Sequence, residues 1–177
     1  MLKKLKGLST QRLGWLLLLI SALILELTAL YFQHGMALQP CVLCIYERVA
    51  LFGVLIAGAV GLIAPQFLIT RLIAIAVGLA SAIKGLLIAL KHVDYQMNPA
   101  PWKQCSVFAD FPETLPLDKW FPFMFKPTGT CNEITWQFLG LTMAQWIVVI
   151  FAFYIALLLF VLLSQLTRTH KQRRLFH

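Results

Sequence analysis

Cys41 and Cys44 lie three residues apart, directly after Pro40 and at the start of a long apolar run. Proline is favoured at or just before the first turn of a helix, so the pattern predicts a cysteine pair at a helix N-terminus. Arg48 follows at helical spacing, which predicts both sulfurs and the guanidinium on one face. A helix N-terminus and a nearby cation both favour the thiolate, the reactive form of cysteine. The chemistry indicated is thiol–disulfide exchange.

Two more cysteines, Cys105 and Cys131, bracket a proline-rich segment. None of the four lies inside a long apolar run, so two disulfides are expected if these segments face an oxidising compartment. A disulfide between Cys105 and Cys131 would be exposed on a mobile loop and open to exchange with a partner protein. The two pairs would then form a relay from a soluble dithiol to an acceptor in the membrane.

A quinone suits the role of that acceptor, because it is apolar and takes two electrons. Arg48 could hydrogen-bond a quinone oxygen and stabilise the negative charge that develops there. Two further candidates for this part of the site are Glu47, beside Arg48, and His92, at the outer end of a later apolar run. A histidine at the membrane boundary with no ligand is the simpler interpretation of His92.

Three alternatives to this chemistry fit the sequence less well. Two disulfides that only staple loops would make a structural or assembly protein, but a CxxC ring is a poor staple. A zinc site would need a second close pair of ligands, and Cys105 and Cys131 are 26 residues apart, so no metal is expected. A transporter would need a continuous polar path, and the apolar runs contain only isolated charges such as Glu26 and Lys84.

The composition places the chain in the membrane. The sequence is 60% hydrophobic and only 12% charged, and four apolar runs approach the roughly 20 residues that span a bilayer. We expect an all-α, four-transmembrane-helix bundle that forms a single domain over residues 1–177. The predicted spans are about 14–32, 45–63, 72–90 and 144–163, with outer loops at 33–44 and 91–143.

The basic residues indicate the orientation. They crowd the two ends and the middle turn, where no acid accompanies them, at Lys3, Lys4, Lys6, Arg12, Arg71, Arg168, Lys171, Arg173 and Arg174. Basic flanks favour the cytoplasm, so both termini are predicted there and all four cysteines on the opposite side. The formal charge of +8 is therefore a sign of membrane orientation and does not indicate nucleic-acid binding.

Small residues and buried charges predict how the spans pack. Gly53, Ala57 and Gly61 recur every four residues in the second span, and the third span carries a matching stripe, which predicts a tight hairpin of these two helices. Glu26 in the first span needs a partner or else stays neutral, and Lys84, at a comparable depth, could either pair with it or extend its side chain outward to the membrane surface. Residues 115–125 mix aromatic, acidic and basic side chains, so they form either a short element on the membrane or a loop packed on the helix ends.

Several segments also resemble the DsbB family of disulfide bond formation proteins, the quinone-linked oxidants of the bacterial envelope. The matching segments are residues 26–30, 32–34, 40–48, 115–120 and 138–141. The resemblance implies that Cys41, Cys44, Cys105 and Cys131 are redox-active, that Arg48 and His92 lie near the quinone, and that the quinone is ubiquinone or menaquinone. It also implies that the chain resides in the bacterial inner membrane and reoxidises DsbA, a periplasmic thioredoxin-like dithiol oxidase.

Overall fold

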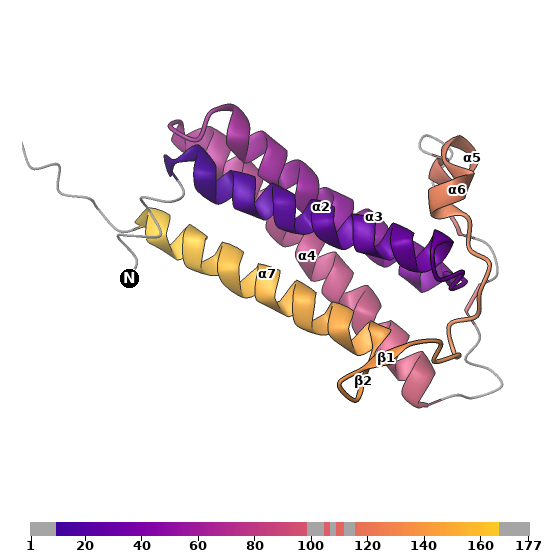
Figure 1. Cartoon of the computed structure of the whole chain (residues 1–177). Helices are drawn as coiled ribbons and strands as arrows, with labels where there is room; N and C mark the ends of the chain where they lie inside the picture. The colour runs from indigo at the N-terminus through magenta and orange to yellow at the C-terminus, as the bar shows by residue number, and fades with distance from the viewer. Residues whose placement is uncertain (1–9, 99–104, 107–108, 112–115, 167–177) are drawn as a thin grey trace, which may run out of the picture.

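Four long helices dominate the computed structural model, which describes residues 10–98, 105–106, 109–111 and 116–166. They are α2 (Arg12–His34), α3 (Val42–Ile63), α4 (Leu68–Met97) and α7 (Met143–Leu166), and they lie side by side as one elongated bundle (Figure 1). Each is long and apolar enough to cross a membrane. The predicted all-α, four-helix membrane fold is confirmed. The predicted basic tails, apart from Arg12, lie outside the described residues.

Two helix ends differ from the predicted spans in ways that affect the site. α3 begins at Val42, because Cys41 adopts an extended backbone as the N-cap and its sulfur accepts a hydrogen bond from the Cys44 N–H. α4 continues past residue 90 as far as Met97, so His92 lies on a helix and not in a loop. The turn between α3 and α4 contains Pro65, which cannot continue the ladder of α3.

Small residues let the helices approach one another closely. A Cβ added at Gly53 would collide with the Ser81 side chain of α4, and one added at Gly78 would lie 3.2 Å from Cβ of Ala57. The predicted close packing of α3 on α4 is therefore confirmed. Gly61, the third member of the stripe in α3, instead makes room for Trp15 of α2. The stripe thus serves two interfaces, because α3 packs between α2 and α4.

The core extends along the bundle axis, and α7 closes it against α4. Phe151 and Leu158 of α7 are buried, and they pack where Gly85 and Gly78 of α4 leave space. Ser21 and Tyr154 share a hydrogen bond of 3.0 Å that joins α2 to α7. Large apolar side chains on the outer faces stay exposed, as expected for helices whose solvent is lipid.

The outer connection folds over one end of the bundle. It contains two short helices, α5 (Leu117–Trp120) and α6 (Pro122–Phe125), and a hairpin of β1 (Gln137–Phe138) and β2 (Leu141–Thr142). Both hairpin-loop residues, Leu139 and Gly140, have positive φ, which fits the twist of a two-residue turn. The hairpin leads directly into α7, and the Trp146 indole N–H donates to the Phe138 carbonyl.

The described part of the predicted interfacial element, residues 116–125, packs on the ends of α2 and α3. Phe125 is buried and its ring contacts that of Phe52, while the Phe123 carbonyl accepts a hydrogen bond from Gln33. This agrees with the alternative of a loop packed on the helix ends. Trp120, Phe121 and Phe123 remain at least 49% exposed, so contact of this outer face with the membrane stays a prediction.

Candidate functional site

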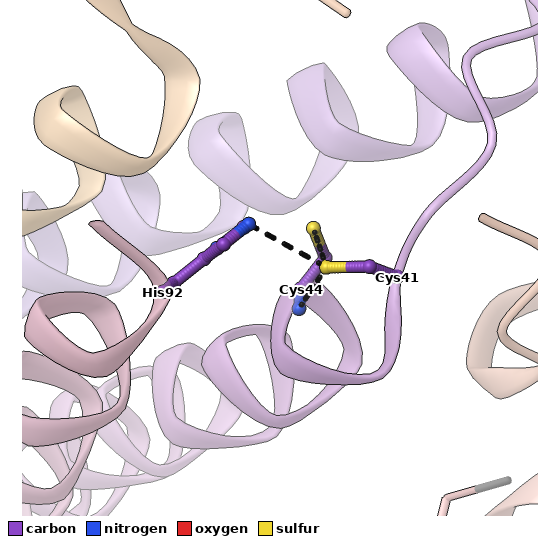
Figure 2. Close-up of side chains that lie close together, drawn as sticks. All are labelled: Cys41, Cys44 and His92. Carbon is purple, nitrogen blue, oxygen red and sulfur yellow. Dashed lines mark hydrogen bonds between the residues drawn. The ribbon is translucent and has the colours of Figure 1, made fainter. Parts of the chain in front are cut away.

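The two cysteines of the CxxC pair lie in contact at the start of α3 (Figure 2). Their sulfurs are 2.8 Å apart, and both are free thiols. Cys41 is the N-cap and Cys44 lies in the first helical turn, so the prediction of a cysteine pair at a helix N-terminus is confirmed. The Cys41 sulfur accepts a hydrogen bond from the Cys44 N–H, so it lies at the positive end of the α3 dipole.

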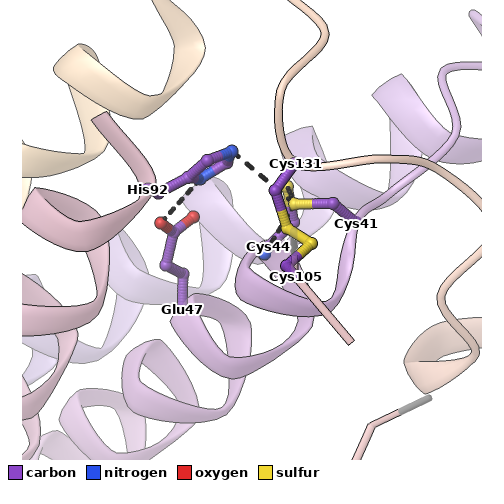
Figure 3. Close-up of a disulfide and its surroundings, with 6 residues drawn as sticks. All are labelled: Cys41, Cys44, Glu47, His92, Cys105 and Cys131. Carbon is purple, nitrogen blue, oxygen red and sulfur yellow. Dashed lines mark hydrogen bonds and ion pairs between the residues drawn. A yellow bond between two sulfur atoms is a disulfide. The ribbon is translucent and has the colours of Figure 1, made fainter. Parts of the chain in front are cut away.

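A histidine and a glutamate continue from the cysteines in a chain of contacts (Figure 3). Nε2 of His92 lies 3.6 Å from the Cys41 sulfur, and Nδ1 of the same ring lies 3.0 Å from a Glu47 carboxylate oxygen. Both side chains are buried, His92 on α4 and Glu47 on α3. Because one ring nitrogen faces sulfur and the other faces carboxylate, the imidazole can pass a proton between them.

Cys105 and Cys131 form a disulfide that packs against the CxxC pair. Cys131 belongs to the same buried cluster as Cys41 and Leu43, and Cys105 lies against it. The expectation of an exposed disulfide is wrong for Cys131, which is only 1% exposed, while Cys105 is partly buried. The two disulfide-forming pairs therefore meet in one place (Figure 3).

Backbone hydrogen bonds explain why this disulfide is buried. The N–H groups of Thr128 and Gly129 both donate to the Pro40 carbonyl, at 2.9 and 3.1 Å. A Cβ at Gly129 would collide with the Gln39 carbonyl oxygen, so this approach depends on glycine. The tie leaves Cys131, two residues further on, beside Cys41. On the Cys105 side, the Asp110 N–H donates to the Tyr46 hydroxyl at 2.7 Å.

Cys44 also lines a cavity of about 300 Å³ that lies between α2, α3 and α7. Aromatic and aliphatic side chains form most of its wall, including Phe32, Leu51, Trp136, Trp146 and Ile147. The wall also includes Cys44, Glu47, Arg48 and Glu26. Cys41 is not part of this wall, because its backbone is extended and the helical spacing that aligns Cys44 with Arg48 does not apply to it.

Arg48 is held at the cavity by three neighbours. One terminal nitrogen, Nη1, donates to the Gln33 side-chain oxygen at 2.8 Å and to the Met124 carbonyl. Its Nε lies 3.7 Å from a carboxylate oxygen of Glu26. Of the two alternatives for Lys84, the pairing with Glu26 is wrong and the outward position agrees with the structure, because Lys84 is exposed on the outer face of α4. Since α2 packs on α3, Glu26 faces Arg48 instead.

The chain is similar to known disulfide bond formation proteins. The profile of the family described as "Disulfide bond formation protein DsbB" matches residues 11–161. A "Disulfide bond formation protein B" from Pasteurella multocida is 60% identical over the whole of both chains. A protein of the same name from Haemophilus influenzae is 58% identical over the whole of both chains. Another, from Aeromonas hydrophila, is 50% identical over 95% of this chain and 97% of its own length.

The chain belongs to the DsbB family. The resemblance predicted from the sequence motifs is thereby confirmed, and family membership gives the chain a role in disulfide bond formation. Within the DsbB match lie all four cysteines and the three other predicted site residues, Glu47, Arg48 and His92. The structure brings these seven side chains together at one end of the bundle.

Some residues of the site were not predicted. Gln33 anchors Arg48, and Trp136 and Trp146 form part of the cavity wall. Gln33 lies in a segment that matches the DsbB family, which is the one signal that pointed toward it. Cys41, Cys44 and His92 also place their ligand atoms within 4.8 Å of one another, and this set cannot be recognised from cysteine spacing because His92 lies 48 residues after Cys44. Among the described residues no fourth ligand joins them, as a closed tetrahedral zinc site requires.

Proposed function

We propose that this protein reoxidises DsbA, a periplasmic thioredoxin-like dithiol oxidase, by relaying electrons through its two cysteine pairs to a membrane quinone, either ubiquinone or menaquinone. It is thus a protein thiol:quinone oxidoreductase that sustains disulfide bond formation. The observation that carries the proposal is that Cys44 and Arg48 line one apolar cavity, while Cys41 packs with the Cys105–Cys131 disulfide on the opposite side.

The cavity fits a quinone ring in size and chemistry. Its volume of about 300 Å³ lies at the lower end of the range of small-molecule sites, and its wall is apolar with a few convergent polar groups. Arg48 would hold a ring oxygen, and Trp136 and Trp146 would pack on the ring faces. A bound quinone supplies a two-electron, two-proton acceptor at the Cys44 sulfur.

The first exchange takes electrons from the partner protein. A partner thiolate attacks the Cys105 sulfur, the less buried of the pair, so a mixed disulfide forms and Cys131 leaves as thiolate. The second partner thiolate then attacks the mixed disulfide. The partner departs oxidised, and Cys105 and Cys131 together hold two electrons.

The second exchange passes those electrons to the helix-held pair. The Cys131 thiolate attacks Cys41 of the Cys41–Cys44 disulfide, which releases Cys44 as thiolate at the cavity. Cys105 then attacks Cys131 and restores the loop disulfide, leaving Cys41 and Cys44 reduced. The burial of Cys131 against Cys41 supports this order, because the attacking and accepting sulfurs belong to one packed cluster.

His92 and Glu47 can manage the proton of Cys41. When the dithiol is oxidised, the Cys41 sulfur must lose its proton, and Nε2 of His92 is the closest ring nitrogen at 3.6 Å. Glu47 accepts or shares the proton on Nδ1 and, as part of the cavity wall, faces the acceptor. The pair thus moves a proton in the same direction as the electrons.

The proposed location follows from the charges and the cysteines together. Basic residues without acids at both chain ends and beside Pro65 favour a cytoplasmic position for those segments of a bacterial inner-membrane protein. The cysteine end of the bundle would then face the periplasm, where disulfides persist and DsbA acts.

Anaerobic reduction of a short-chain quinone by reduced DsbA, with and without this protein in detergent or lipid vesicles, tests the proposal. We expect catalysed loss of the quinone absorbance, with one quinone reduced for each DsbA oxidised. Cys44→Ser is the matched control, since it keeps the size of the side chain but cannot form the helix-held disulfide. A wild-type rate no faster than that of the control would refute the proposal and favour the structural role of stapled loops.

A further inference from the structure

We propose that Glu26 is the charge-balancing proton acceptor of the cavity: it takes up one proton whenever a second negative charge arrives beside Arg48. The inference deepens the proposed function and rests on it, since the arriving charge is that of a reduced or anionic quinone. Glu26 would be a group that touches the ligand directly, because it forms part of the cavity wall.

The first observation is that Glu26 and Arg48 are buried but have side-chain atoms without a hydrogen bond. They are 2% and 7% exposed, and among the hydrogen bonds of the described residues neither carboxylate oxygen of Glu26 nor Nε of Arg48 takes part. Their separation of 3.7 Å makes an ion pair without a hydrogen bond. Buried polar atoms in such a state are rare and call for an explanation, and a ligand in the cavity provides one.

The second observation is the charge count around the cavity. Within the described part of the wall the ionisable groups are Cys44, Glu47 and Arg48 on α3 and Glu26 on α2. The residues contributed by α7 and by the segment before it carry no ionisable side chain: Thr135, Trp136, Met143, Trp146, Ile147, Ile150 and Phe151. Arg48 is therefore the single cation in the described wall, and Glu26 already balances it.

A second anion beside Arg48 would upset this balance. In a buried site with apolar walls, two negative charges next to one guanidinium repel each other strongly, because little water screens them. Protonation of Glu26 removes one of the two charges without moving any helix. Uptake of a proton by Glu26 is thus the least costly response to negative charge on the ligand.

Glu26 is better suited to this role than Glu47, the other carboxylate of the wall. Glu47 is hydrogen-bonded to His92 at 3.0 Å, so its charge is tied to the cysteine side of the site. Among the ionisable groups of the described residues, Glu26 pairs with Arg48 alone, so a charge that competes for Arg48 acts on Glu26 first. The two carboxylates would have different roles: Glu47 accepts protons that come from the thiols, and Glu26 takes up a proton when negative charge appears on the acceptor.

The test compares two probes in wild type, Glu26→Gln and Glu47→Gln. The probes are 1,4-naphthoquinone, which is neutral, and 2-hydroxy-1,4-naphthoquinone, which is an anion at neutral pH. Quenching of tryptophan fluorescence measures binding, since Trp136 and Trp146 line the cavity. A pH-indicator dye in weakly buffered solution counts the protons taken up on binding. Thermal unfolding verifies that each variant folds.

In the wild type we expect about one proton taken up per anionic probe bound and none per neutral probe. Because uptake accompanies binding, the affinity for the anion should fall about tenfold for each pH unit above neutrality. In Glu26→Gln, which is neutral at every pH, the uptake and the pH dependence should vanish. Its affinity for the anion relative to its affinity for the neutral probe should rise roughly tenfold, because Arg48 is no longer shared with a carboxylate.

The outcomes separate this inference from the proposed function. If neither probe binds the wild type, the quinone site itself is refuted. If both bind but proton uptake survives in Glu26→Gln and disappears in Glu47→Gln, the proposed function stands and the role assigned to Glu26 is wrong. Equal loss of both probes in a folded Glu26→Gln protein would likewise overturn the inference, since it would make Glu26 a purely structural partner of Arg48.

Discussion

The two cysteine pairs are built on different kinds of structure. Cys41 and Cys44 are held by a single helix start, where the spacing of the chain alone brings their sulfurs to 2.8 Å. Cys105 and Cys131 are 26 residues apart, and no described long helix carries either of them. Their position depends on a few contacts to neighbouring segments, chiefly those of residues 128–129 with Pro40.

This difference suits the two pairs to separate roles in the proposed relay: the inner pair reacts at the cavity, and the outer pair supplies it with electrons. A helix start fixes a pair of thiols and adds its dipole, so the inner pair keeps its geometry whatever the outer loop does. The outer disulfide is held by backbone hydrogen bonds of residues 128–129 and of Asp110, and Cys105 is its less buried half, so in the proposed relay Cys105 is the sulfur that meets the partner. Changes at the inner pair should stop the chemistry, whereas changes at the outer pair should stop only its supply of electrons.

The largest effect is expected from the cysteines themselves. Cys44→Ser should reduce quinone turnover by roughly 1,000-fold or more with any electron donor, since the disulfide at the cavity cannot form. Cys105→Ser should abolish turnover with reduced DsbA but retain it with dithiothreitol, a small dithiol that reaches Cys41–Cys44 directly. Quinone absorbance measured with both donors checks this. If Cys105→Ser lost dithiothreitol-driven turnover as completely as Cys44→Ser, the proposed order of the pairs would be wrong.

Arg48→Met should have the next largest effect, confined to the inner region. Loss of the charged donor should raise the KM for quinone roughly 10- to 100-fold, equivalent to about 1.4–2.8 kcal/mol. The KM of Arg48→Lys should lie between those of the wild type and Arg48→Met, because lysine keeps the charge but not the planar set of donors. Steady-state kinetics with dithiothreitol measure the effect without the outer pair.

A double variant controls for the stability of Arg48→Met. Removing Arg48 leaves the buried Glu26 without its cation, so part of any loss could reflect unfolding. Arg48→Met combined with Glu26→Gln removes both charges and should recover thermal stability while the KM for quinone stays high. Normal kinetics in Arg48→Met would leave Arg48 as an anchor for the loop through Gln33 and Met124.

Gly129→Ala should have a smaller effect, confined to the outer region. The new Cβ collides with the Gln39 carbonyl, so residues 128–131 must move away from Pro40 and carry Cys131 from Cys41. Turnover with reduced DsbA should fall roughly tenfold, as expected for a misplaced attacking group, and turnover with dithiothreitol should not change. Thr128→Ala is the matched control, since it keeps both backbone hydrogen bonds. Equal behaviour of the two variants would show that the tie to Pro40 does not couple the pairs.

Lys84→Met should have the smallest effect and bears on neither region. The side chain is exposed on α4 and is not the partner of Glu26, so the free energy of unfolding should change by less than about 0.5 kcal/mol. Turnover with either donor should match that of the wild type. A large loss of stability, measured by thermal unfolding in detergent, would restore Lys84 as a partner of a buried charge.

The sequence by itself determined the elements that depend on local pattern. Four apolar runs of bilayer length specified four helices, since a chain in lipid must satisfy its backbone groups within each helix. Pro40 followed by the CxxC pair specified thiols at a helix start, because that geometry involves only neighbouring residues. The motifs around Cys41 and Glu26 were enough to indicate the DsbB family, and with it a role in disulfide bond formation.

Only the tertiary structure decided which distant residues meet. Arg48 and Lys84 both lay at depths that Glu26 could reach, and the rotation and register of α2 on α3 selected Arg48. The meeting of Glu47 with His92, 45 residues apart, depends in the same way on how α3 and α4 pack and on the extension of α4 to Met97. The burial of Cys131 depends on a loop that turns back to the Pro40 carbonyl. Such contacts arise from side-chain packing between elements, and local sequence spacing carries no information about it.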